Sequence, residues 1–562
     1  MKKFLAFTVA LGMLTGTMAM ASGKTETPES PKAVSGGTMV SNQEKSWETF
    51  KSNPVTLSLY VDDKNMDPKV FMEYKALIPK LMKEQTGVTL NIRTAVDQTE
   101  TSINLMIASG EYPDLMFLDV TRQAAKTLID NDLIWSFDEL KSKFGMDVIN
   151  RMNINQRFTQ RRIFSNDNIY YATAYGFNDT HVNSPWLVKW QTGGYINETL
   201  WKGVGSPAIK SMADLMKVAQ DIKTKYPRVE FPISVTRNTG TGMFNEAAEF
   251  SALRMYYGLN DPSTYWTVGK GYKFYIQAPA FLDMLKDVNK MVNLELISPV
   301  MWTGSKNDKM ATVFNGIACF ELNGDSDNFT WYNQELQKKY PNEQYVMLPP
   351  FGANPKYQFT TAGTYGSGGN FGWCVPKSAK DPARVAAYID YMLSDDFQKM
   401  NVYGREGLEH TIVDGVPKLT PAILNMETTG TDIAGEYGFN VLGGAVRDNY
   451  WQMMQRLQRF DDMRQGISVL KPAIDKYKDL NTAAENVNLA YPADSEEVKI
   501  YSQIKEVFGD ELMKILLGPS DKVEASYAAL LARVEKMGLQ KLADFQNKAA
   551  LNQAEVIKKY RR

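Results

Sequence analysis

Hydrophobic and polar positions follow the patterns of strands and helices in turn along the first part of the chain. Apolar and polar side chains alternate in two short runs, a third short run is wholly apolar, and the segments between them read as helices. The predicted elements are strands over 55–61, 88–92 and 115–118 and helices over 71–85 and 102–108. Because helices separate consecutive strands, we predict an α/β fold with a mostly parallel sheet flanked by helices.

Residues 194–320 repeat this order and predict a second sheet. Ser211 has the hydroxyl side chain that caps a helix start, and a helical pattern begins directly after it. The predicted elements are helices over 212–225, 281–292 and 309–315 and strands over 231–235 and 316–320. The segment from 441 to 562 is mostly helical in pattern, with helices predicted over 450–459, 495–508, 523–537 and 543–560.

The stretch 364–411 joins a flexible approach to a strand and a helix. Four glycines within 366–372 permit backbone conformations that other residues disfavour, which is typical of a hinge or a ligand loop. A short apolar strand is predicted over 373–375. Pro382 then stands in the first turn of a predicted helix, where a missing amide hydrogen is tolerated. We predict that this stretch connects two parts of the fold.

Length and charge limit the class of protein. At 562 residues the chain is too long for one core of roughly 100–200 residues, so we predict at least two domains. The 63 basic and 64 acidic residues nearly cancel, which gives a net charge of −1 without a long run of one sign. This balance argues against nucleic acid or an anionic membrane as partner.

The N-terminus has the features of an export signal. Two lysines precede an apolar run over 4–14, and a small-residue sequence follows that ends at Ala21. We predict a signal peptide over 1–21 and a flexible linker over 22–53, which is rich in small and polar residues. Neither cysteine lies near the cleavage point, so no lipid anchor is expected. We expect a soluble mature protein in the periplasm or outside the cell.

Signatures of catalysis and of metal binding are weak. His181 and His410 are too few for a histidine-rich metal site, and no phosphate-binding loop is present in the sequence. We therefore expect no catalytic residue, no metal and no cofactor. One alternative stays open, because the acidic loop 325–328 offers oxygen ligands for a calcium ion. Cys319 and Cys374 fall in predicted strands of different parts of the fold, so both are expected to be free and buried.

Several motifs, taken in their order along the chain, resemble one protein family. The sequence INLMIASGEYPD leads into the strand at 115–118, and YGREGLEHT at 403–411 is followed by VDGVPKL at 413–419. This order is similar to that of family 1 extracellular solute-binding proteins of ABC importers, in particular the large oligosaccharide-binding subgroup. The resemblance extends over nearly everything from Pro54 onward.

The resemblance implies a two-lobed fold of the periplasmic-binding-protein-like type II, with the ligand in a cleft between the lobes. It places lobe 1 at 54–178 and 371–430, and lobe 2 at 179–370 and 431–562. Crossings between the lobes are expected near Tyr175, Gly372 and 428–430. The implied function is capture of an oligosaccharide or glycoside, which a monomer without enzymatic activity delivers to the importer's membrane subunits.

Residues at the carboxyl ends of the strands are the candidates for ligand contact, because ligands of open parallel sheets bind there. The first and third strands point to Asp62, Asp63 and Asp119. Acidic and amide groups can bond sugar hydroxyls, and aromatic rings can stack on sugar rings. The candidate ligand-binding residues are Asp63, Asp119, Tyr175, Asn178, Arg237, Asn238, Trp302, Asn323, Asp325, Tyr365, Trp373 and Glu406. Trp302 is expected in a loop; for Trp373, a core position is the equal alternative.

Two other functions fit the same residues. A secreted carbohydrate-active enzyme also has an aromatic cleft with carboxylates. The same scaffold can also bind a peptide or another non-sugar ligand, because a fold does not fix its ligand.

Overall fold

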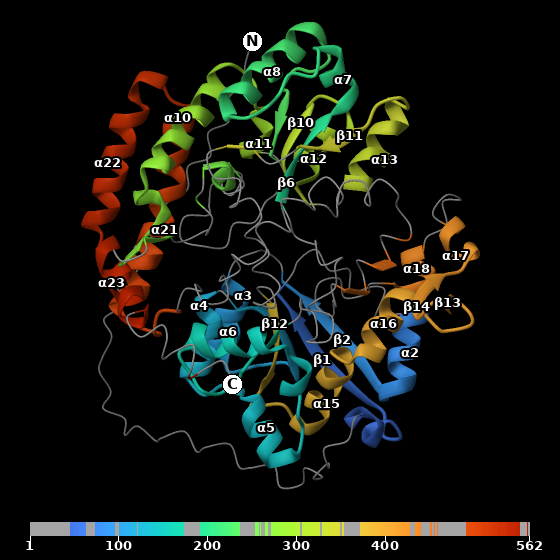
Figure 1. The fold of residues 1–562 in the computed structure, drawn as a ribbon. Helices are drawn as coiled ribbons and strands as arrows, with labels where there is room; N and C mark the ends of the chain where they lie inside the picture. The colour runs from blue at the N-terminus through green and yellow to red at the C-terminus, as the bar shows by residue number, and fades with distance from the viewer. Residues whose placement is uncertain are drawn as a thin grey trace, which may run out of the picture. The chain divides into compact units, whose positions relative to one another are not determined.

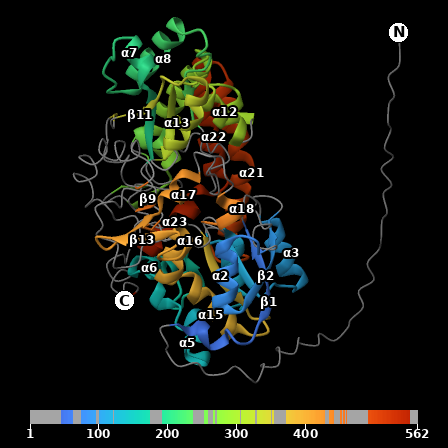
Figure 2. The same cartoon turned by 90° about the vertical axis from the view of Figure 1, so that its right-hand side faces the viewer.

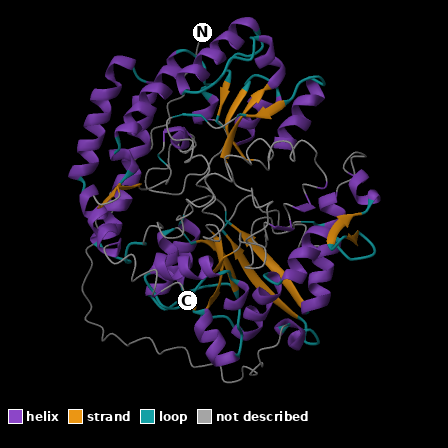
Figure 3. Ribbon diagram, viewed as in Figure 1, coloured by secondary structure: helices purple, strands orange, loops and turns teal. Residues whose placement is uncertain are grey.

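The structure is a computed structural model in which two larger sheets are each flanked by helices (Figure 1, Figure 3). It describes residues 45–62, 74–95, 100–120, 122–173, 192–235, 253–257, 259, 265–267, 271–303, 306–325, 329–348, 351–352, 371–426, 433–439, 450–451, 454–455, 458, 490–550 and 559.

The first sheet has the strand order β2-β1-β3-β12-β4, and β5 also pairs with β12. Its strands are β1 (Val55–Val61), β2 (Val88–Thr94), β3 (Leu115–Asp119), β4 (Ile134–Trp135), β5 (Ala172–Thr173) and β12 (Phe371–Pro376). Strand β1 pairs in parallel with β2 and β3, whereas β12 runs antiparallel to β3, β4 and β5. All described strands of this sheet except β12 therefore run in one direction.

Both faces of the first sheet are apolar, and each is covered by helices. Successive side chains of a strand point to opposite faces, so Leu59 and Val61 of β1 join one core and Tyr60 joins the other. The first core is covered by η1 (Ser46–Phe50), α2 (Leu77–Thr86), α5 (Phe137–Phe144), η2 (Ile149–Arg151), α15 (Pro382–Met392) and α16 (Asp395–Tyr403). The second core is covered by α3 (Thr101–Ser109), α4 (Gln123–Asp130) and α6 (Ile154–Phe164); Figure 2 shows α2 and α3 beside β1 and β2.

The second sheet has the order β11-β6-β10-β7. Its strands are β6 (Thr192–Asn197), β7 (Ile233–Ser234), β10 (Phe320–Asp325) and β11 (Tyr345–Met347). Strand β10 pairs in parallel with β7 and antiparallel with β6, and β11 is also antiparallel to β6. Strand β6 is thus the reversed one among the described strands here, as β12 is in the first sheet. The predicted α/β fold with sheets flanked by helices is confirmed, and both sheets are mixed, because β12 and β6 run antiparallel to their neighbours.

Helices from two distant parts of the sequence build the core beside the second sheet. They are α7 (Glu198–Gly203), α8 (Met212–Lys225), α10 (Pro279–Asn293), α11 (Val300–Thr303), α21 (Glu496–Leu517), α22 (Val523–Lys536) and α23 (Leu539–Ala550). Helices α12 (Lys306–Phe314) and α13 (Phe329–Lys339) pack in a separate cluster with Tyr195 and Tyr345 of the same sheet. The amide of Asn289 on α10 donates hydrogen bonds to the carbonyls of Leu516 (3.0 Å) and Gly518 (2.8 Å). Because the last carbonyls of a helix have no partner within it, this buried amide fixes the end of α21 to α10.

Smaller elements complete the described part of the chain. They are β8 (Tyr265–Thr267) paired with β9 (Gly271–Lys273), β13 (His410–Val413) paired with β14 (Val416–Leu419), α17 (Pro421–Met426), α18 (Ile433–Tyr437), η4 (Arg254–Tyr257), η5 (Tyr275–Gln277) and η11 (Ser520–Lys522).

Most predicted elements are confirmed, and the differences have local reasons. The helix predicted over 212–225 has these bounds, and the Ser211 hydroxyl accepts a hydrogen bond from the Asp214 amide at 3.1 Å. The strand predicted over 316–320 begins only at Phe320, since Gly316 has the positive φ of 64° that follows the end of α12. The helix predicted over 71–85 begins at Leu77, and residues 63–73 lie outside the described part.

Trp302 lies in a short helix instead of the predicted loop. The residue belongs to α11, and the Ser298 hydroxyl accepts a hydrogen bond from the Val300 amide at 3.3 Å. Such a serine cap favours a helical turn directly after it. The sequence pattern did not reveal this turn because the helix is only four residues long.

Residues 490–493 connect the two sets of cores, a contact that the sequence did not predict. The Ala490 amide donates to the carbonyl of Ile163 on α6 at 2.9 Å, and the Gln123 side chain of α4 donates to the carbonyl of Tyr491 at 2.9 Å. The ring of Tyr491 packs instead with the helices of the second sheet, 5.2 Å from the ring of Phe545. The backbone of this segment therefore contacts one core while a side chain belongs to the other.

The two cysteines are free and buried, as the sequence predicts. Cys319 lies in the core of the second sheet and Cys374 in the second core of the first sheet. Burial raises the pKa of both thiols, because a thiolate would lose its hydration. Neither thiol is therefore activated for chemistry.

Truncation of Trp373 tests the packing of the first sheet. The side chain has no exposed surface, and its ring centroid lies 4.7 Å from that of Phe117. We expect Trp373→Ala to lower the free energy of unfolding by about 3–5 kcal/mol in urea denaturation, because it leaves a large cavity. Trp331→Ala is the matched control, since this tryptophan of α13 is 42% exposed, and it should cost less than about 1 kcal/mol. Equal losses in the two variants would contradict the assignment.

Candidate functional site

Two buried carboxyl groups lie at the carboxyl ends of β1 and β3. Asp62 follows β1 and Asp119 is the last residue of β3, and each is only 1% exposed. The Asp62 amide donates to the Phe117 carbonyl at 2.9 Å, which continues the pairing of β1 and β3 up to this point. Because the two strands are parallel, their ends bring both aspartates to one edge of the sheet, as the sequence predicts.

Arg122 links the two aspartates. Its guanidinium donates to a carboxylate oxygen of Asp62 at 3.0 Å, and its Nε lies 3.6 Å from Oδ2 of Asp119. The side chains are almost completely buried, so this is an ion-paired cluster without access to bulk water. Arg122 stands immediately before α4, so the helix start fixes its backbone next to the strand ends. We call these three residues the charged cluster.

The charged cluster alters the acidity of Asp62. Burial raises the pKa of its carboxyl group, Arg122 opposes this effect, and the negative charge of Asp119 raises the pKa further, to about 7 in total. The hydroxyl of Tyr60 donates toward Asp62 at 3.5 Å, and burial raises the pKa of that phenol to about 12. At neutral pH, Asp62 is therefore partly protonated and can either donate or accept a hydrogen bond.

The second sheet also places polar groups in its interior. Glu321 of β10 is fully buried and lies opposite Ser234 of β7. The Thr312 hydroxyl of α12 donates to the Ser234 hydroxyl at 3.4 Å. Buried polar groups of this kind need partners, so they commonly mark structural or ligand-binding networks.

Sequence reasoning missed Arg122 and Glu321. Arg122 follows Asp119 by three residues and directly precedes a helical pattern. A basic residue between a strand end and a helix start could have indicated a partner for the aspartate. Glu321 gave no such signal, because one acidic residue within an apolar strand also fits an exposed position.

The structure describes three of the twelve predicted ligand residues completely. Asp119 belongs to the charged cluster, while Trp373 and Glu406 lie elsewhere. The backbones of Trp302, Asn323 and Asp325 are described on α11 and β10, but their side chains are not. The predicted residues outside the described part are Asp63, Tyr175, Asn178, Arg237, Asn238 and Tyr365.

Trp373 is a core residue. Its indole is fully buried in the first core of the first sheet, together with Val375. The alternation along β12 explains this position, because Trp373 and Val375 share one face while Cys374 points to the other. Its ring packs within this apolar core against Phe117, at a centroid distance of 4.7 Å, so the structure favours the core alternative over ligand contact.

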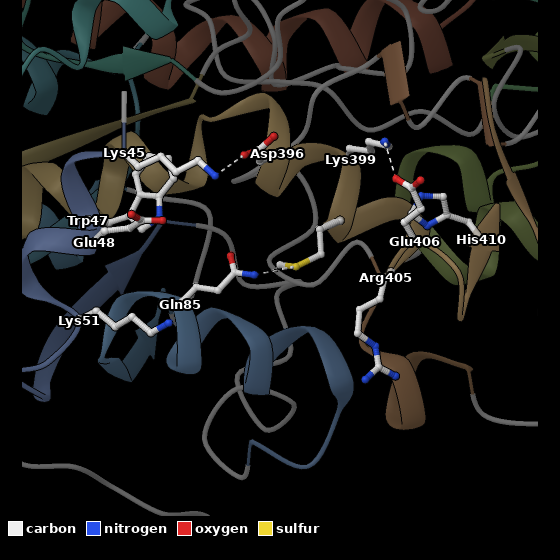
Figure 4. Close-up of a pocket in the computed structure, with 12 residues that line it drawn as sticks. Lys45, Trp47, Glu48, Lys51, Gln85, Asp396, Lys399, Arg405, Glu406 and His410 are labelled. Carbon is white, nitrogen blue, oxygen red and sulfur yellow. Dashed lines mark hydrogen bonds and ion pairs between the residues drawn. The ribbon is translucent and has the colours of Figure 1, made fainter. Parts of the chain in front are cut away.

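Glu406 lies at the opposite edge of the first sheet from Asp119. It lines a pocket of about 460 Å³, where its carboxylate is 3.9 Å from the ammonium of Lys399 (Figure 4). The same pocket includes Lys51 and Gln85, which precede the starts of β1 and β2. At about 3.3 Å per residue, these strand starts lie roughly 20 Å from the carboxyl ends. The structure therefore does not bring Glu406 and Asp119 together.

Residues able to hold a metal are not gathered in the described part of the chain. No group of three or more His, Cys, Asp and Glu side chains has a suitable arrangement there. The side chain of Asp325 and residues 326–328 lie outside the described part, so the calcium alternative stays a prediction.

Comparisons with known proteins identify a family and a fold. A family model described as bacterial extracellular solute-binding protein matches residues 76–405, which is more than half of the chain. No curated protein matches by sequence. The alginate-binding protein AlgQ2, solved without calcium ion, has a TM-score of 0.64 at 15% identity and covers 89% of this chain and 99% of its own.

Two further solved structures are similar. FusA, an ABC-transporter substrate binding protein of S. pneumoniae in complex with kestose, has a TM-score of 0.62 at 17% identity and covers 89% of this chain and 100% of its own. The N-glycan transport solute binding protein of Streptococcus pneumoniae has a TM-score of 0.53 at 14% identity. The match covers 90% of this chain and 99% of that protein. At these identities the likeness shows a shared two-lobed fold.

The charged cluster predicts a stability that decreases as the pH rises. The pKa of Asp62 is raised from its usual 3.8 to about 7, so between these values the folded chain keeps a proton that the unfolded chain has lost. The stabilisation is complete below pH 3.8 and is lost as the pH rises through 7. The measurement is the free energy of unfolding in urea at pH 4 and at pH 8. Between these values, Asp62→Asn should lose about 2–4 kcal/mol less stability than the wild type loses.

Asp221→Asn is the control for this measurement. Asp221 pairs with Lys217 on an exposed face of α8, so this variant should keep the pH dependence of the wild type. If Asp62→Asn and the wild type had the same pH dependence, the raised pKa would be wrong.

Proposed function

The chain belongs to the bacterial extracellular solute-binding proteins, and we propose that it captures an oligosaccharide or glycoside and delivers it to the membrane subunits of an ABC importer. The observation that carries this proposal is the charged cluster at the carboxyl ends of β1 and β3. In open α/β sheets, this edge is where ligands bind. Carboxylate and guanidinium groups there can exchange their mutual hydrogen bonds for bonds to sugar hydroxyls.

The similar structures support a sugar as the ligand class. Their names refer to alginate, kestose and an N-glycan, which are all carbohydrates. Each of these structures matches at least 89% of this chain, so the likeness extends over most of the fold. The aromatic content of 11% provides rings that can stack on sugar faces.

Export and partners follow from the same family. The apolar run over 4–14 supports a signal peptide, after which the protein would work as a monomer in the periplasm or outside the cell. Among the described residues, no helix is long and apolar enough to cross a membrane. The proposed partners are the membrane subunits of the importer.

Binding without turnover fits the described residues better than catalysis. His410 is 2% exposed, its Nδ1 lies 3.1 Å from the Tyr403 carbonyl, and burial lowers the pKa of its imidazole. It lies in the Glu406 pocket and not beside the charged cluster. A carbohydrate-active enzyme remains the second candidate because one feature favours it: a carboxyl group with a raised pKa beside a second carboxylate is also an arrangement of glycoside hydrolases.

Ligand binding and turnover can be measured on the same sample. We expect kestose, an alginate oligosaccharide or an N-glycan to raise the apparent melting temperature of the mature protein, since a ligand of the folded state stabilises it. No reducing sugar should appear over hours of incubation. A peptide panel is the control. Release of reducing sugar would establish the enzyme, and a melting temperature that responds only to peptides would overturn the sugar proposal.

Trp302 remains a candidate for stacking on the sugar. We expect Trp302→Ala to weaken binding of the sugar identified above by about tenfold, because a stacked indole contributes about 1 kcal/mol or more beyond its area. The melting temperature of the ligand-free protein should change little. Trp331→Ala is the control, since that tryptophan is exposed on α13 of the same lobe. An unchanged affinity in folded Trp302→Ala would remove this residue from the site.

A further inference from the structure

Helix α6 is polar in sequence but buried in the fold. The segment INQRFTQRRIF has four apolar side chains among eleven residues, yet the polar side chains of Gln156, Thr159 and Gln160 are at most 4% exposed. These three side chains occupy positions i, i+3 and i+4, so they lie on one face of the helix. Burial of a polar face is costly unless its groups find hydrogen-bond partners.

Gln156 has such partners and shows where this face points. Its side-chain oxygen accepts from the Asn153 amide at 2.7 Å, and its side-chain nitrogen donates to the carbonyl of Thr173 at 3.2 Å. Thr173 is the last residue of β5. The polar face of α6 is therefore directed at the carboxyl end of β5, and Gln160 follows Gln156 by one helical turn.

Three neighbouring side chains have polar atoms without partners among the described residues. They are the hydroxyl of Thr159, both amide atoms of Gln160 and the hydroxyl of Thr173, and each side chain is at most 2% exposed. Native proteins rarely leave buried polar atoms unpaired, so a group of this kind requires an explanation. We call Thr159, Gln160 and Thr173 the neutral cluster.

Thr173 of the neutral cluster lies at the same edge of the first sheet as the charged cluster. Gly372 of β12 pairs with Thr173 on one side and with Leu118 on the other, and Leu118 directly precedes Asp119. Thr173 and Asp119 are thus separated by one strand, which corresponds to about 10 Å across the sheet. This spacing suits groups that contact different hydroxyls of one oligosaccharide.

We propose that the neutral cluster is a second part of the ligand-binding site, where Gln160, Thr159 and Thr173 bond the hydroxyl groups of a sugar unit. This inference rests on the proposed function and names residues for it. Sugar hydroxyls both donate and accept, which matches an amide and two threonine hydroxyls. The three side chains are themselves uncharged, so they suit a hydroxyl-rich group; the charged side chains of the same helix are those of Arg157, Arg161 and Arg162.

Gln160→Met tests the proposal, because methionine is similar in size and lacks the amide. Calorimetric titration with kestose, an alginate oligosaccharide and Man5GlcNAc, combined with melting of the ligand-free protein, gives the two readouts. We expect the variant to bind the sugar that the wild type prefers about tenfold more weakly or worse. The ligand-free melting temperature should stay equal or rise, since two buried polar atoms without partners are removed.

Gln156→Met is the matched control on the same face of α6. Gln156 already has partners within the protein, so its replacement should lower the ligand-free melting temperature. If Gln160→Met also lowered that temperature and kept wild-type affinity, buried water would satisfy the cluster and the proposal would be overturned. A wild type that binds none of the three sugars would instead overturn the proposed function and this inference together.

Discussion

Insertion of β12 between strands from the first part of the chain is the constraint on which the first sheet depends. Strand β12 pairs with β3, β4 and β5, so it alone joins β4 and β5 to the parallel strands in the described sheet. Gly372 permits this position: a side chain there would place its Cβ 2.9 Å from Cβ of Tyr171 and 3.2 Å from Cγ1 of Val120. The close approach holds both polar clusters at fixed places along one edge.

The two polar clusters differ in what they can offer a ligand. The charged cluster is already paired internally, so a ligand must compete with the bonds between Arg122 and the aspartates. The neutral cluster has no such competition among the described residues. A ligand gains most where buried polar atoms would otherwise stay unpaired, since those atoms have already lost their hydration. The neutral groups would then determine affinity, whereas the charged ones determine orientation.

Local patterns predicted the strands and helices, but contacts between distant segments decided the site. The alternation along 55–61 and the Ser211 cap are properties of neighbouring residues, so both could be read from the sequence. The face that Trp373 occupies depends on its pairing with Phe117, more than 200 residues earlier. The burial of helix α6 could not be predicted from its sequence either. Its polar residues are typical of a surface helix, and only the packed fold shows that they are buried.

Separate burial protects the two thiols in a chain that, as we propose, is exported before it folds. Extracytoplasmic compartments oxidise exposed thiols, and an unfolded chain exposes both Cys319 and Cys374. In the folded protein they belong to separate cores, so a bond between them would prevent each from reaching its place. Formation of the two cores therefore keeps the thiols apart and out of reach of oxidants.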